Sequence, residues 1–123
     1  MQKYNSKFKS DLKGRCYKFS LDLIAFIGTL PKNQSSLIIG NQVIRSGTSV
    51  GANLIEATAA SSRREFKKYH EIALKSANET KYWLGLLRDS GKADGKSVEK
   101  LLSEVSEIAN MIAAGILKLK AGI

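Results

Sequence analysis

The sequence predicts an all-α protein with the architecture of an up-and-down four-helix bundle. Along four segments apolar residues recur every three or four positions, which is the spacing of a helix with one buried face. No segment shows the two-residue alternation and Asn-Gly turns that are typical of strands and hairpins. Four amphipathic helices joined by mostly short connections favour a bundle in which neighbouring helices run up and down.

The length and composition indicate a single folded domain. The chain has 123 residues, enough for one domain with a real core. Hydrophobic residues make up 43% of it and there is one proline, which argues against a disordered or fibrous chain. We predict three regions, namely a basic N-terminal arm over 1–10, the bundle over 11–119 and a C-terminal tail over 120–123.

The first two helices are expected on either side of Pro31. The first is expected over about 11–29, because the rigid proline ring closes the segment. Its apolar stripe consists of Leu12, Phe19, Leu23, Phe26, Ile27 and Leu30. The residues from Asn33 to Ser36 offer several N-caps for the second helix, which is expected to run to about Ala60.

The third and fourth helices are expected on either side of a glycine-containing loop. Ser62 and Glu65 match a capping box at the start of the third helix, and Gly91 marks its end. Its stripe consists of Phe66, Tyr69, Ala73, Ala77, Thr80, Leu84 and Leu87. The loop is expected over 91–97. The fourth helix then carries a near-heptad seam of Val98, Leu101, Leu102, Val105, Ile108, Ile112, Ile116 and Leu119.

Three glycines interrupt the second helix, although each costs about 1 kcal/mol relative to alanine in a helix interior. At 100° per residue Gly40, Gly47 and Gly51 fall on one side of that helix, together with Ile44. Such a stripe lets a neighbouring backbone approach closely, which offsets the lost propensity. We therefore interpret the glycines as a close-packing surface in preference to a hinge.

A polar row occupies another face of the same helix. It consists of Asn41, Arg45, Ser49, Asn53 and Glu56. Three interpretations are open: a solvated surface, a buried polar seam or subunit interface whose hydrogen bonds set register, and a direct contact with a ligand or nucleic acid. The second interpretation is the leading one. A homo-oligomer is also expected because Leu, Ile and Val lie on more than one face of the second and fourth helices.

The chain is strongly basic, with a formal net charge of +9. Such an excess attracts polyanions, and nucleic acid is the first partner to consider. The candidate contacts are Lys3, Lys7 and Lys9 in the arm and Arg64, Lys67, Lys68 and Lys75 on the outer side of the third helix. No base-reading motif accompanies them, so binding is expected to be driven by phosphate with little sequence specificity. The alternative is a solvated charged face.

The residues of common catalytic sites are sparse. His70 is the only histidine and Cys16 the only cysteine, and neither has a second catalytic group nearby in sequence. No cluster of ligands predicts zinc, and the glycines of the second helix do not follow a phosphate-loop pattern. We expect no catalysis, no metal and no cofactor. The N-terminus lacks the apolar core of a signal peptide and no apolar run could cross a bilayer, which predicts a cytoplasmic protein.

Two blocks of sequence carry a resemblance to a known family. The first block runs from Arg45 to Asn53 and continues with Glu56 and Ala57. The second contains Ser62, Glu65, Phe66, Ile72, Ala73, Leu74, Ser76, Glu79, Tyr82, Trp83 and Leu84. Together they resemble the four-helix-bundle proteins encoded in intervening sequences of bacterial 23S ribosomal RNA. The resemblance implies a bundle that assembles as a ring-like pentamer. It also implies kinship with accessory proteins of diversity-generating retroelements, pentameric barrels that engage a reverse transcriptase and nucleic acid.

The expected function is therefore that of a non-catalytic, oligomeric bundle that binds RNA or DNA through basic surfaces. The alternative is a protein-interaction scaffold whose surface docks a partner such as a reverse transcriptase. A steep fall of nucleic-acid affinity with salt would favour the first function. Association with a protein that survives nuclease treatment would favour the second.

Overall fold

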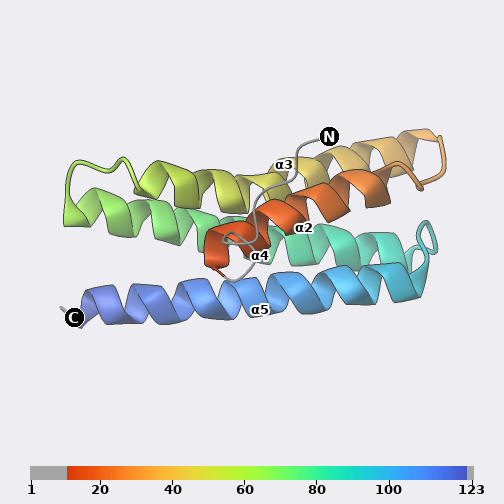
Figure 1. The fold of residues 1–123 in the computed structure, drawn as a ribbon. Helices are drawn as coiled ribbons and strands as arrows, with labels where there is room; N and C mark the ends of the chain where they lie inside the picture. Colours follow the sequence, from red (N-terminus) through yellow and green to blue (C-terminus); the bar gives the residue numbers. More distant parts are fainter. Residues whose placement is uncertain (1–10, 122–123) are drawn as a thin grey trace.

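A computed structural model describes residues 11–121, which form a bundle of four helices (Figure 1). The helices are α2 (Leu12–Ile27), α3 (Gln34–Ala57), α4 (Arg63–Asp89) and α5 (Gly95–Lys120). Each helix packs antiparallel against the next, and α5 closes the bundle by contacting α2. The predicted all-α, up-and-down architecture is confirmed. The predicted arm and the last two residues of the predicted tail lie outside the described residues.

Side-chain caps start all four helices. Asp11 accepts a hydrogen bond from the Gly14 amide at 2.6 Å, and Asn33 accepts one from Ser36 at 3.0 Å. Ser62 caps α4 as expected. Glu65 departs from the predicted capping box, because its carboxylate accepts from the backbone of Ser61 at 2.7 Å.

The start of α5 corrects the predicted loop over 91–97. The helix already begins at Gly95, because the Asp94 carboxylate accepts hydrogen bonds from the Ser97 amide at 3.0 Å and the Ser97 hydroxyl at 2.9 Å. These bonds lower the pKa of Asp94, the hydroxyl contributing most. A strong N-cap therefore outweighs the low helix propensity of the glycine that follows it.

The helix ends follow local backbone geometry. α2 ends at Ile27 and α3 at Ala57, earlier than predicted in both cases. At the end of α4, Gly91 has a φ of 74°, and its amide donates to the Arg88 carbonyl at 3.1 Å. The next amide donates back to Leu87 at 3.0 Å. This pair of bonds is a Schellman motif, which explains why a glycine stops this helix.

One apolar core runs through the bundle, and all four helices contribute to it. Its largest fully buried apolar side chains are Phe19, Leu23, Val43, Val50, Leu84, Leu87, Val98, Val105, Ile108 and Ile112. Most of them belong to the predicted stripes, because a core position must recur with the period of its helix.

The three glycines of α3 lie against α2. A Cβ atom at Gly51 would lie 3.0 Å from the Cβ of Cys16, and one at Gly40 would lie 3.2 Å from a methyl group of Leu30. A Cβ at Gly47 would overlap the Cδ1 methyl of Leu23. The absence of these side chains lets α2 and α3 approach closely along their whole contact.

Candidate functional site

A polar seam joins α3 to α4 inside the bundle. At its centre, the Oγ1 of Thr80 lies 2.9 Å from the Oγ of Ser46, and both residues are fully buried. The Thr80 hydroxyl also lies 2.7 Å from the Ser76 carbonyl oxygen, and the Ser46 hydroxyl donates to the Gln42 carbonyl at 2.8 Å. Every hydroxyl in this part of the seam is satisfied, which is what makes a buried polar group tolerable.

The predicted polar row of α3 supplies the half-buried part of the seam. The Ser76 hydroxyl donates to the Oγ of Ser49 at 3.1 Å, and Asn53 donates to the same oxygen at 2.9 Å. Asn53 also donates to the Ser49 carbonyl at 2.9 Å. Ser49 therefore contacts α4, and Asn53 holds the Ser49 side chain from within α3.

The rest of the row lies at the surface. Arg45 forms an ion pair with Glu79 of α4 and donates to the Gln42 side chain at 2.8 Å. Asn41 and Glu56 are exposed. The structure thus brings Arg45 and Ser49 into contact with α4, pairs Asn53 with Ser49 within α3, and leaves the two ends of the row facing outward.

Sequence reasoning missed the α4 partners of this row. Ser76, Glu79, Thr80 and Trp83 recur at three- and four-residue steps, so they share one face of their helix. That spacing could have identified a polar face, but only the packing of α4 against α3 shows which residues it meets. The seam fixes how the two helices are paired and rotated.

The outer edge of the seam contains the chain's single tryptophan. The Trp83 indole donates a hydrogen bond to the Glu79 carboxylate at 2.8 Å, and this bond, together with Arg45, lowers the pKa of Glu79 below its ordinary value of 4.5. A carboxyl whose pKa is lowered by folding stabilises the fold above its unfolded pKa. That contribution is lost as the pH falls through the folded pKa.

We predict that tryptophan emission reports the protonation of Glu79. Between pH 6 and about pH 3 the emission should shift before the helix signal in circular dichroism is lost, because the indole loses a charged acceptor. Glu79→Gln should remove that early shift. Glu99→Gln, which removes an exposed carboxylate paired with Arg88, is the control and should keep it. An identical shift in the Glu79 variant would contradict the assignment.

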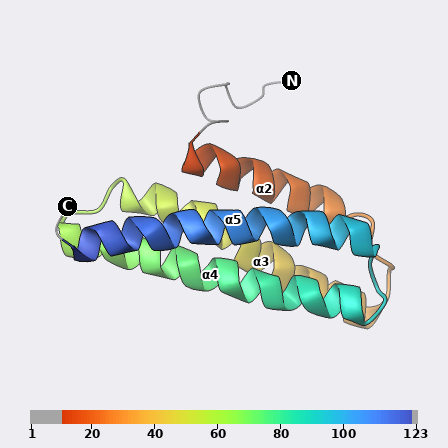
Figure 2. The ribbon, with the colours of Figure 1, turned by 90° about the horizontal axis from the view of Figure 1, so that it is seen from below.

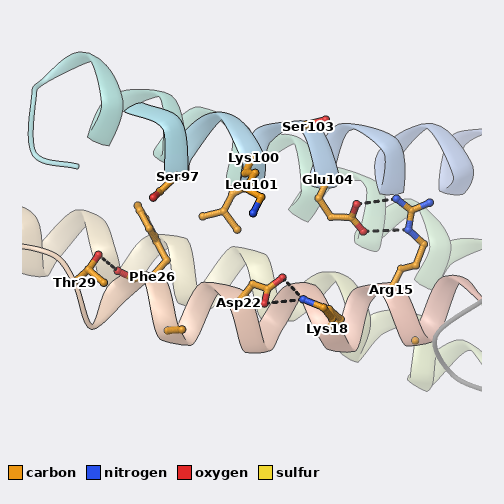
Figure 3. Close-up of a pocket in the computed structure, with 12 residues that line it drawn as sticks. Arg15, Lys18, Asp22, Phe26, Thr29, Ser97, Lys100, Leu101, Ser103 and Glu104 are labelled. Atoms are coloured by element: carbon orange, nitrogen blue, oxygen red, sulfur yellow. Dashed lines mark hydrogen bonds and ion pairs between the residues drawn. The ribbon is translucent and has the colours of Figure 1, made fainter. Parts of the chain in front are cut away.

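A groove of about 1080 Å³ separates α2 from α5 (Figure 3). Arg15 reaches across it and donates to both oxygens of Glu104, at 2.7 and 3.0 Å, and to Glu107 at 2.8 Å. These hydrogen bonds raise the pKa of Arg15 above its ordinary value. Lys18 pairs with Asp22 on the α2 side at 2.9 Å. The pairs of Arg15 with Glu104 and Glu107 hold α2 to α5, and the pairing of charges on the groove wall leaves little surplus charge for an ionic ligand.

The basic residues predicted on α4 divide into two groups. Lys68 and Lys75 are exposed along the outer face, whereas Arg64 and Lys67 lie near the start of the helix. The Lys67 ammonium is 4.0 Å from Glu71, a loose pair. The candidate contacts Lys3, Lys7 and Lys9 lie outside the described residues.

A basic cleft of about 390 Å³ is lined by residues from the start of α4 and the end of α5. These two helix ends lie side by side at one end of the bundle (Figure 2). Its lining consists of Arg63, Arg64, Lys67, Leu119 and Lys120. The Arg63 guanidinium donates to the Leu119 carbonyl at 3.4 Å and so links the two helix ends. Sequence analysis did not single out Arg63 and Lys120. The antiparallel pairing of α4 with α5 could have identified them, because it places the first residue of one helix beside the last residue of the other.

The two residues considered for nucleophilic or general-base chemistry serve packing. Cys16 is buried, and burial raises the pKa of its thiol to about 12, so little reactive thiolate exists at neutral pH. The His70 Nδ1 lies 2.9 Å from the Phe66 carbonyl oxygen of its own helix. Within 11–121, no three His, Cys, Asp or Glu side chains are grouped so that they could hold a metal ion. No described helix is long and apolar enough to span a bilayer.

A family model and a solved structure both match this chain. The family model described as "23S rRNA-intervening sequence protein" matches residues 9–114. A solved structure of a protein with unknown function, assigned to the S23 ribosomal protein family from Bacteroides thetaiotaomicron VPI-5482, is 34% identical with a TM-score of 0.81. The match covers 86% of this chain and 98% of that one. No curated protein matches the chain.

Proposed function

The chain belongs to the 23S rRNA-intervening sequence protein family, and on that premise we propose that it is a non-catalytic protein that binds nucleic-acid phosphates. The observation that carries this proposal is the surplus of cations on the outer face of α4. Arg64, Lys68 and Lys75 are exposed and have no acidic partner among residues 11–121. A face with this surplus of positive charge favours a polyanion over a small neutral ligand.

The same face offers an aromatic side chain. Tyr82 is 61% exposed and lies on the solvent side of α4, close in azimuth to Arg64 and Lys75. An exposed ring on the same face as cations can stack on an unpaired base, whatever the identity of that base. Phosphate contacts and stacking both tolerate any sequence, which supports binding with little sequence specificity.

We further propose that the protein self-associates through an apolar face of α2 and α3. This α2–α3 apolar face consists of Tyr17, Leu21, Ile24, Leu37 and Ile55, all of them more than 40% exposed. On the helical wheel both sets of residues border the residues through which α2 and α3 touch, so they lie on the same side of this pair of helices. None of the five side chains is charged, whereas the chain carries +9. Copies can therefore meet there with the least charge repulsion.

Self-association also bears on the binding of nucleic acid. Each copy repeats the basic face of α4, and contacts on one strand then reinforce each other through effective concentration. The family resemblance favours a pentamer. A ring of copies would turn a modest patch into a multivalent surface.

The test of nucleic-acid binding is the dependence of affinity on salt. Replacing Lys67 and Lys68 with glutamine should weaken binding about equally for unrelated RNA and DNA sequences. It should also flatten the slope of log affinity against log salt by about 0.9 per lost phosphate contact on duplex DNA. Folding should barely change, because exposed ion pairs contribute about 0–1 kcal/mol. Fluorescence anisotropy over a salt series measures both quantities.

The matched control replaces Lys96 and Lys100 with glutamine. Both are exposed and lie in the first turns of α5, at the end of the bundle away from the basic cleft. This variant has the same net charge as the first, so a purely global charge effect would weaken binding equally in both. Equal affinities of the α4 variant and the parent at every salt concentration would refute the proposed surface. Capture of one protein partner that resists nuclease would then favour the scaffold alternative.

A further inference from the structure

The basic cleft differs in kind from the exposed cations along α4. Four of its five lining residues are cationic, and no acidic residue is among them. The cations come from two helices, and they line a common hollow of about 390 Å³ that is open to solvent. This volume falls within the range of small-ligand sites, roughly 300–1,000 Å³.

The side chains alone determine the sign of the charge in the cleft. α4 begins there and α5 ends there, so the positive end of one helix dipole lies beside the negative end of the other. These two contributions oppose each other. Arg63, Arg64, Lys67 and Lys120 therefore make the site cationic through their own charges.

The position of each cation is defined to a different degree. Arg63 is exposed and donates a long hydrogen bond to the Leu119 carbonyl at 3.4 Å, and Lys67 is half-buried with its ammonium 4.0 Å from Glu71. Arg64 and Lys120 are exposed at the rim and have no acidic partner among the described residues. Three exposed cations and one half-buried cation around the same hollow suit a compact anion that enters from solvent.

We propose that this cleft binds a phosphomonoester group, such as the terminal phosphate of a nucleic-acid strand. A phosphomonoester carries a charge of about −1.5 to −2 at neutral pH on three terminal oxygens. A phosphodiester in the middle of a strand carries a single charge, so four converging cations match the monoester better. One guanidinium group can also donate two parallel hydrogen bonds to two oxygens of the same phosphate. The nucleic-acid strand as the source of the phosphate rests on the proposed function.

The first experiment compares strands that differ only at their ends. Fluorescence anisotropy is measured with single strands of about ten nucleotides that carry a 5′-phosphate, a 3′-phosphate or hydroxyl ends. A hydroxyl-ended strand about two nucleotides longer matches the total charge of the phosphorylated ones. One of the phosphorylated strands should bind about tenfold more tightly than the charge-matched strand, because additional charge-assisted hydrogen bonds are worth roughly that much.

The second experiment uses variants of the rim. Arg64→Gln combined with Lys120→Gln should abolish the preference for the phosphorylated end and leave the melting temperature unchanged, since both side chains are exposed. The Lys96→Gln and Lys100→Gln variant removes the same charge elsewhere and should keep the preference. A nucleoside 5′-monophosphate, titrated by calorimetry, tests the group without a strand and should bind the parent but not the rim variant.

These measurements separate this proposal from the proposed function. If phosphorylated and charge-matched strands bind the parent equally, the cleft proposal is wrong while nucleic-acid binding stands. If no strand binds at any salt concentration, the proposed nucleic-acid binding is wrong. The titration with the nucleoside monophosphate then tests the cleft proposal by itself. Mononucleotide binding that the rim variant loses would then identify free nucleotides as the ligand, and absence of binding would overturn the cleft as a phosphomonoester site.

Discussion

Replacing Gly47 with leucine should destabilise the bundle by about 1–3 kcal/mol or more. Even a Cβ atom at this position would overlap the Leu23 Cδ1 methyl, and it would lie 3.6 Å from Thr80. Leu23 is fully buried, so its displacement disturbs the core around it. The larger side chain should therefore push α2 away from α3. Chemical denaturation monitored by circular dichroism measures the free energy of unfolding.

Alanine substitutions at two glycines separate close packing from helix propensity. Gly47→Ala should also destabilise, though less than leucine, because Leu23 can turn its methyl away only at a cost in core packing. Gly85 lies within α4 and has no atom within 4 Å of its ideal Cβ position. Gly85→Ala should stabilise by about 0.5–1 kcal/mol through helix propensity. A leucine variant at position 47 with the parent's stability would contradict the close-packing explanation.

Aspartates on the α2–α3 apolar face should convert the proposed oligomer to monomers. Leu21 and Ile24 are 45% and 58% exposed on α2, outside the core of a single chain. Leu21→Asp with Ile24→Asp should therefore leave the fold intact, while two charges without partners oppose burial between copies. Light scattering at micromolar concentration should give the mass of an oligomer for the parent and of a monomer for this variant.

A charge-matched variant controls for the change in net charge. Asn110→Asp with Ala114→Asp adds two aspartates at exposed positions one turn apart on α5. This variant should keep the parent's mass, because its changes lie away from the α2–α3 apolar face. A parent that is monomeric under the same conditions would refute self-association. An oligomer that persists in the Leu21 and Ile24 variant would place the interface on another face.

The helices themselves could be read from local sequence. Phe19, Leu84 and Ile112 were assigned to the core because each stripe repeats with the helical period, which is a local property. Asp94 shows where this reasoning failed. The glycines around it predicted a loop, yet one carboxylate that caps two groups of Ser97 outweighs the propensity of Gly95.

The candidate sites depended on relations between helices. Sequence reasoning identified a polar row on α3 but not its partners, because no local pattern states which face of α4 meets Ser49 and Arg45. The same limit applies to the basic cleft. Arg63 and Lys120 are far apart in the chain and come together only because α5 returns antiparallel to the start of α4.

The sequence by itself determined four amphipathic helices, their buried faces and the glycine surface of α3, since period, caps and side-chain size act over a few residues. The tertiary structure decided the pairing of Ser49 with Ser76, the ion pair of Arg45 with Glu79, and the cations that share one cleft. Those contacts depend on the register and rotation of whole helices. Packing of the entire core sets these two quantities at once, so no short segment of sequence contains them.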